Sequence, residues 1–147
     1  MQLRLKNVPI SEPHIVGIIL GVLLHYVFRR KTLLQGWIGR LIGCPLVVLG
    51  TGLSLWAAIE AGKTDISSPE RLVTTGPYAH TRNPMYLGWS LVYVGVSFIV
   101  NSIWLMGLFP FVMAYMHFAD VRGEERFLET EFGSRYRDYR DEVPRYL

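Results

Sequence analysis

Two polar blocks of the sequence carry most of the side chains that could do chemistry. Residues 76–86 read GPYAHTRNPMY and supply tyrosine, histidine and arginine groups. Residues 122–126 read RGEER and supply two adjacent carboxylates between arginines. Charges of both signs and aromatic rings are therefore available, a set that suits a zwitterionic ligand with an aromatic base. Because long apolar segments adjoin both blocks, they indicate a site at a membrane boundary rather than a linker.

The same residues have a plainer interpretation as membrane anchors and surface ion pairs. Tyrosine and arginine commonly anchor helices at an interface, and an exposed ion pair contributes under about 1 kcal/mol. Glu125 argues against this interpretation, because helical spacing puts it on the apolar face that carries Leu128 and Phe132. A carboxylate there is costly without a cation. We therefore expect an arginine or a cationic ligand against Glu124 or Glu125.

The composition indicates a membrane protein that holds these blocks in place. Half of the 147 residues are hydrophobic and only 18% are charged, whereas a soluble domain carries about 25% charged residues. A spanning helix needs about 20 mostly apolar residues. We expect a single all-α, integral-membrane domain over residues 1–147, with about four transmembrane helices. The predicted spans are residues 9–28, 41–61, 86–100 and 103–118.

The last two spans are predicted to form a tight hairpin that turns at Asn101 and Ser102, with Pro110 kinking the second helix. Three prolines exclude one continuous helix over residues 62–85, so we expect a loop with at most one short helical turn. An amphipathic helix should follow Asp120 and end at Gly133. A basic and aromatic tail completes the chain.

The distribution of Lys and Arg predicts the topology. With four crossings, both termini and the loop at residues 62–85 share one side, which receives eleven of the basic residues, and the other side receives four. We therefore expect both termini and the polar blocks in the cytoplasm, in a membrane that we take to be the inner membrane of a prokaryote. The two blocks then lie at the two ends of one hairpin and can meet.

Two longer stretches of sequence resemble a known family of enzymes. Residues 72–78, LVTTGPY, and 82–89, RNPMYLGW, are similar to those of the integral-membrane methyltransferases of the isoprenylcysteine carboxyl methyltransferase and phospholipid methyltransferase superfamily. The Glu124-Glu125 pair followed by Leu128, the Phe132-Gly133 pair and later tyrosines is similar too. The resemblance spans about residues 70–145, half of the chain, in matching order.

The resemblance implies an S-adenosylmethionine pocket under the hairpin, built from segments 70–86 and 120–145, with S-adenosylhomocysteine as product. In the family, the segment matching residues 70–73 wraps the cofactor with backbone groups, and the first glutamate of the pair binds its polar end. The implied cofactor-binding residues are Glu70, Arg71, Leu72, Val73, Tyr78, His80, Arg82, Asn83, Pro84, Met85, Tyr86, Glu124 and Glu125. Arg122 is the implied catalytic residue, which contacts the acceptor.

Two positions depart from the family pattern. Asn83 stands where histidine is commonest, and asparagine does not titrate near neutral pH, so we expect no histidine base there. His80 is close enough to substitute, although a plain loop histidine is the alternative interpretation. Asp120 stands where the family's acceptor-binding arginine would align, and this departure makes Arg122 the candidate.

The expected function is methylation of oxygen, nitrogen or sulfur on a small apolar or lipid-like acceptor. A non-enzymatic membrane assembly or interaction protein is the alternative, and a transporter has little support. A soluble methyltransferase is disfavoured because the chain lacks the Gly-rich turn of a dinucleotide-type domain. The scattered histidines predict no metal site. The net charge of +3 gives no nucleic-acid footprint, and the single Cys44 permits no internal disulfide.

Overall fold

The structure is a computed structural model that describes residues 11–28, 36–62 and 71–146. All regular elements in these ranges are helical and none is a strand, which confirms the all-α prediction. They are α1 (Glu12–Phe28), α2 (Gly36–Ala61), the short helix η2 (Gly76–Ala79), α3 (Pro84–Val100), α4 (Ile103–Tyr115), the π-helical turn η3 (Met116–Val121), α5 (Arg122–Phe132) and α6 (Ser134–Glu142).

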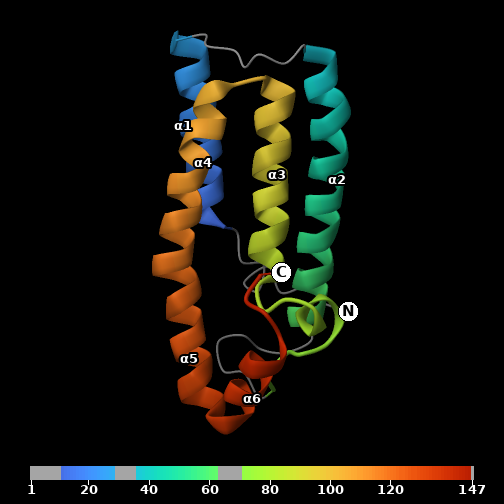
Figure 1. The fold of residues 1–147 in the computed structure, drawn as a ribbon, viewed down its shortest axis with the longest axis vertical. Helices are drawn as coiled ribbons and strands as arrows, with labels where there is room; N and C mark the ends of the chain where they lie inside the picture. The colour runs from blue at the N-terminus through green and yellow to red at the C-terminus, as the bar shows by residue number, and fades with distance from the viewer. Residues whose placement is uncertain (1–10, 29–35, 63–70, 147) are drawn as a thin grey trace.

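The four apolar helices lie side by side, as Figure 1 shows, with α1 beside α4 and α3 between them and α2. Two helices in the described chain are long and apolar enough to cross a membrane, at Gly36–Ala61 and Ile103–Phe132. The other two, Glu12–Phe28 and Pro84–Val100, are shorter but also apolar. The four predicted segments are therefore helical, although α2 begins five residues earlier than predicted. The structure also corrects one detail, since Cys44 is exposed on α2 rather than buried.

Glycines let α2 and α3 approach until their backbones touch. A Cβ on Gly43 would lie 2.5 Å from the Gly95 carbonyl oxygen, and one on Gly95 would lie 2.7 Å from the Gly43 oxygen. The same holds for Gly50, where a Cβ would lie 2.5 Å from the carbonyl oxygen of Gly88. Small residues are the usual means of close helix packing in lipid, where no hydrophobic effect drives helices together.

The predicted hairpin between α3 and α4 turns at Asn101 and Ser102. Asn101 adopts the left-handed conformation, with φ of 55°, which asparagine tolerates better than most residues. The Ser102 side chain then caps α4 by accepting a hydrogen bond from the backbone N–H of Leu105. The hairpin therefore returns the chain to the end of the bundle where α3 began.

Beyond the hairpin, the structure differs from the prediction in two ways. The fourth span and the amphipathic helix are one continuous helix, Ile103–Phe132, which passes through the π-helical turn η3. Gly133 ends this helix as predicted, with φ of 56°. The tail then forms a further helix, α6, which the charged sequence of residues 134–142 did not suggest.

His14 links α1 to α3 inside the bundle. Its Nε2 lies 3.1 Å from Ser90 Oγ, and its Nδ1 is hydrogen-bonded to Ser11 Oγ. Because Ser90 Oγ donates to the Tyr86 carbonyl oxygen at 2.8 Å, it accepts from His14, whose proton we assign to Nε2. Nδ1 then accepts from Ser11, so both ring nitrogens of this fully buried side chain are satisfied.

Replacing His14 with alanine should lower the free energy of unfolding by about 2–3 kcal/mol, because the change leaves a cavity and strands the Ser11 hydroxyl without its partner. Thermal and denaturant unfolding of the purified protein in one detergent would measure this loss. His80→Ala provides the control, since His80 is exposed and its removal should change stability by less than about 0.5 kcal/mol. Equal stability of the two variants would show that the link contributes nothing.

Candidate functional site

The two polar blocks of the sequence meet at one end of the bundle, where the loop before α3 lies against α5 (Figure 1). The Tyr86 hydroxyl donates a hydrogen bond to Glu124 Oε1 at 2.8 Å. Arg82 Nη1 lies 2.9 Å from Glu125 Oε1 in an ion pair. The prediction that both blocks lie on the same side and come together is therefore confirmed.

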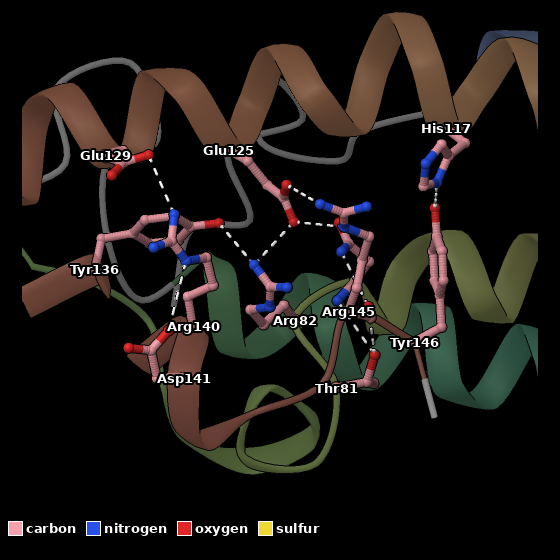
Figure 2. A network of polar contacts seen from close by, with 11 residues as sticks. Thr81, Arg82, His117, Glu125, Glu129, Tyr136, Arg140, Asp141, Arg145 and Tyr146 are labelled. Carbon is pink, nitrogen blue, oxygen red and sulfur yellow. Dashed lines mark hydrogen bonds and ion pairs between the residues drawn. The ribbon is translucent and has the colours of Figure 1, made fainter. Parts of the chain in front are cut away.

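Glu125 is the centre of an ion-pair cluster, shown in Figure 2. Besides Arg82, it receives Arg145 in a two-pronged contact, with Nε 2.9 Å from Oε1 and Nη2 2.7 Å from Oε2. The Glu125 side chain is only 15% exposed. The cation expected against one of the two carboxylates is thus a pair of arginines, and both oxygens of Glu125 are engaged.

The C-terminal tail is tied to the loop before α3 by backbone atoms as well. The Arg82 backbone N–H donates to the Pro144 carbonyl oxygen at 2.9 Å. The Arg145 carbonyl oxygen accepts from Thr81 Oγ1 and from Asn83 Nδ2, each at 3.0 Å. The Asn83 amide therefore holds the tail, a role that needs no titratable group.

An aromatic cluster fills the space under the tail. It consists of Tyr136, Tyr139 and Val143, with Leu72, Leu128 and Phe132 packed around them. The Tyr139 hydroxyl leaves this cluster to donate to the Tyr78 carbonyl oxygen at 2.7 Å. Burial of these side chains explains why α6 forms from so polar a sequence, because its two tyrosines share one face against α5.

The loop that precedes α3 is fixed from the side of α2. Glu60, buried at the end of α2, accepts a hydrogen bond from the Thr75 hydroxyl. Gly76 follows with φ of 62°, and a Cβ there would press on the Glu60 side chain at 3.2 Å. A glycine is thus needed at the start of η2 for both conformation and space.

Tyr78, on η2, is set among negative charges. Burial raises its pKa to about 12, and the charges of Glu124 and Glu60 add to the shift. The hydroxyl therefore keeps its proton at physiological pH and remains a hydrogen-bond donor. This electrostatic influence also shows that Tyr78 lies near Glu124, as the resemblance to the methyltransferases implies.

A cavity of about 830 Å³ opens beside this cluster, between α1 and the long helix that runs from α4 to α5. Tyr86, Asp120 and Glu124 lie at its polar end, together with Ser11 and Glu12 from α1. Its remaining wall is mostly apolar and comes from α1 and α4. It consists of Pro13, Val16, Gly17, Leu20, Leu108, Phe111, Val112, Tyr115 and Gly123.

The structure sorts the residues of the predicted site into four groups. Tyr86 and Glu124 line the cavity. Arg82, Asn83, Pro84 and Met85 are largely or fully buried in the supporting structure, and Leu72, Val73 and Tyr78 are half-buried in the loop. Arg71 and His80 are exposed. Glu70 lies outside the described residues.

Arg122, the predicted catalytic residue, is not among the residues that line the cavity. It is exposed, and its guanidinium carbon lies 4.9 Å from the centre of the Phe118 ring. Asp120 occupies the cavity wall instead. The alignment difficulty at position 120 was the signal, because it marked a real change of residue type at the site.

Sequence reasoning also missed Arg145, Ser11 and Glu12. Arg145 is the strongest partner of Glu125, and its place in the repeated aromatic and basic pattern of the tail gave no sign of this. The two α1 residues reach the site only through helix packing, which no local pattern reports. Glu12 could have been noticed as an acid at the first turn of an apolar helix.

The residues present suit a polar cofactor of the predicted kind. Glu124 uses only Oε1 for Tyr86, and within the described chain its Oε2 has no hydrogen-bond partner. The backbone N–H groups of Leu72, Val73 and Thr74 likewise have none among described residues. No three His, Cys, Asp or Glu side chains in the described ranges are placed to hold a metal ion.

The chain matches one protein family over most of its length. The phospholipid methyltransferase family matches residues 38–135, which include α2, the loop before α3, the hairpin and α5. No solved structure matches the chain significantly.

Several relatives point the same way. Protein-S-isoprenylcysteine O-methyltransferase of Saccharomyces cerevisiae is 33% identical over 110 residues, which cover 69% of this chain and 46% of the relative. Protein-S-isoprenylcysteine O-methyltransferase B of Arabidopsis thaliana is 28% identical over 97% of this chain and 77% of its own length. The nickel-cobalt-cadmium resistance protein NccN of Alcaligenes xylosoxydans xylosoxydans is 30% identical over 72% of this chain and 48% of its own.

The chain spans about half the length of the Saccharomyces relative that it matches. The matched region nevertheless contains both polar blocks and the contacts between Tyr86 and Glu124 and between Arg82 and Glu125. Since more than half of the chain is matched, it belongs to the phospholipid methyltransferase family, within the superfamily that also holds the isoprenylcysteine carboxyl methyltransferases.

Proposed function

We propose that this protein is an S-adenosylmethionine-dependent methyltransferase that methylates a lipid-like or small apolar acceptor at a membrane face. The observation that carries the proposal is the contact between Tyr86 and Glu124. It places a carboxylate with a free oxygen where the loop before α3, the helix α5 and the cavity between α1 and α4 come together. Family membership supplies the class of reaction.

The cofactor site that we propose lies on the loop side of Glu124. The Glu124 carboxylate would bind the cationic polar end of S-adenosylmethionine, and the Tyr78 hydroxyl, protonated at physiological pH, would donate to it. The free N–H groups of residues 72–74 are available for the remaining acceptors of the cofactor. Arg82 and Asn83 act at one remove, because their side chains hold α5 and the tail in place.

The chemistry asks little of side-chain acids and bases. Bound S-adenosylmethionine supplies a sulfonium methyl group whose leaving group is neutral, so no group must protonate it. The protein's part is to align the acceptor and exclude water, and such alignment is worth up to about 7–11 kcal/mol of the barrier. A cavity whose apolar wall adjoins a fixed carboxylate is suited to both tasks.

We place the site on the cytoplasmic side of the membrane. Arginine gathers at the site end of the bundle, in α5, α6 and the tail, whereas the described residues of the other end include only Arg40. Basic residues are enriched on the cytoplasmic side of membrane proteins. A polar cofactor would enter from there, while an apolar acceptor would reach the cavity from the bilayer.

Glu124→Gln and Tyr86→Phe should each weaken the binding of S-adenosylhomocysteine by about tenfold or more, because each removes one side of a charge-assisted hydrogen bond. Isothermal titration calorimetry of the purified protein in detergent measures this. The control is Glu131→Gln, which removes an exposed carboxylate later on the same helix and should leave affinity unchanged. Unchanged affinity in both site variants would contradict the pocket, and no binding to the unmodified protein would favour a non-enzymatic membrane subunit.

Glu125→Gln should instead lower the free energy of unfolding by about 2–3 kcal/mol, since it leaves two arginines without their shared carboxylate. The matched control is Glu129→Gln on the same helix. Glu129 also faces two arginines, but at 3.4 and 3.9 Å and with 39% of its side chain exposed, so its loss should cost under about 1 kcal/mol. Chemical unfolding of both variants in one detergent gives the comparison. A smaller loss for Glu125→Gln than for Glu129→Gln would refute the assignment of Glu125 to structure.

A further inference from the structure

We propose that the cavity between α1 and α4–α5 binds a single-chain amphiphile with a positively charged amine headgroup. The inference rests on the proposed methyltransferase function in one respect, since it names this amphiphile as the class of acceptor. The binding site itself is argued from the cavity alone.

The cavity has two chemically different ends. Its polar end holds three carboxylates, from Glu12, Asp120 and Glu124, which belong to different turns of two helices. The rest of its wall carries aliphatic and aromatic side chains of α1 and α4. A ligand that satisfies both ends must join a polar group to an apolar chain.

The charge of the polar end selects a cation. Among the described residues that line the cavity, none is lysine, arginine or histidine. The arginines closest in sequence are engaged elsewhere, since Arg82 and Arg145 hold Glu125 and Arg122 lies over Phe118. A carboxylate or phosphate headgroup would meet like charges in a partly buried site, which costs free energy, whereas an ammonium group would be attracted.

The geometry favours an organic cation over a metal ion. Although three acids line the cavity, no group of three potential metal ligands converges within the part of the chain that the structure describes. The volume of about 830 Å³ falls in the range of about 300–1,000 Å³ in which proteins hold drug-sized organic ligands. The absence of a partner for the phosphate argues against a phospholipid as the occupant.

The apolar wall gives the chain of such a ligand a route from the bilayer. Leu20 on α1 is 45% exposed and Phe111 on α4 is 73% exposed, although both line the cavity. Side chains that face outward and also line a cavity mark the place where the cavity is open toward the lipid. The headgroup would then lie at Glu124, beside the proposed cofactor site.

The test uses three probes of equal chain length, hexadecylamine, hexadecanoic acid and hexadecanol, each with a photoreactive diazirine in the chain. The full protein is reconstituted in phosphatidylcholine nanodiscs, labelled by light and mapped by mass spectrometry. We expect the amine to label the cavity wall around Leu20 and Phe111 at least about tenfold more than the acid or the alcohol, the effect of one partly buried charge pair or more.

Variants locate the charge that selects the amine. Asp120→Asn and Glu12→Gln should each reduce labelling by the amine about tenfold and leave labelling by the alcohol unchanged. Glu131→Gln, the exposed control on α5, should change neither. Calorimetry with S-adenosylhomocysteine on Asp120→Asn shows that the variant is folded, because its cofactor site is intact.

Each other outcome has a definite meaning. Equal labelling by the amine and the acid, or amine labelling that survives both Asp120→Asn and Glu12→Gln, overturns the inference. Loss of amine labelling when S-adenosylhomocysteine is added also overturns it, because the cavity then belongs to the cofactor. Selective amine labelling in a protein that binds no S-adenosylhomocysteine upholds the binding site and refutes only the proposed methyl transfer.

Discussion

The arrangement of the polar end depends on one carboxylate, Glu125, held between Arg82 and Arg145. These residues come from α5, from the loop before α3 and from the tail, so one charge cluster fixes three segments that are distant in sequence. A carboxylate so little exposed is tolerated only while both arginines remain in place, and the segments are therefore not free to part. Glu124 follows about 100° around the same helix, and its aim at the cavity is set by the neighbour that never touches a ligand.

The membrane bundle supplies the other half of this arrangement. Backbone contacts between glycines of α2 and α3, and the buried bridge from His14 to Ser90, give the helices little freedom to slide. The turn at Asn101 brings the chain back to the end from which α3 began. A site assembled from residues on both sides of a hairpin is accurate only if the hairpin is rigid, and close backbone packing provides that rigidity without polar groups in the lipid.

Local patterns in the sequence predicted the parts of the fold that local physics determines. The apolar segments, the turn at Asn101 and the helix end at Gly133 follow from hydropathy and from residues that tolerate a left-handed backbone. The burden of a carboxylate on an apolar face likewise predicted that Glu124 or Glu125 has a cationic partner. Which of the two has it could not be read, because the partners are supplied by tertiary contacts of Arg82 and Arg145.

The remaining features depend on distant packing or on the phase of a helix. Residues 134–142 are too polar to indicate a helix, which forms because Tyr136 and Tyr139 are buried against other elements. The share of α1 in the cavity depends on its packing against α4. The π-helical turn at Met116–Val121 has no signature in a single sequence, so the side of the helix on which Asp120 lies was not predictable.

This turn also constrains how the protein can change over time. A π-helical turn holds one residue more than an ordinary helix of the same rise, and removing that residue would turn everything after it by about 100°. Glu125 would then leave its arginines and Glu124 would leave the cavity together. Single-residue deletions should therefore be rare between positions 116 and 121 in functional descendants of this chain, even where substitutions there are frequent.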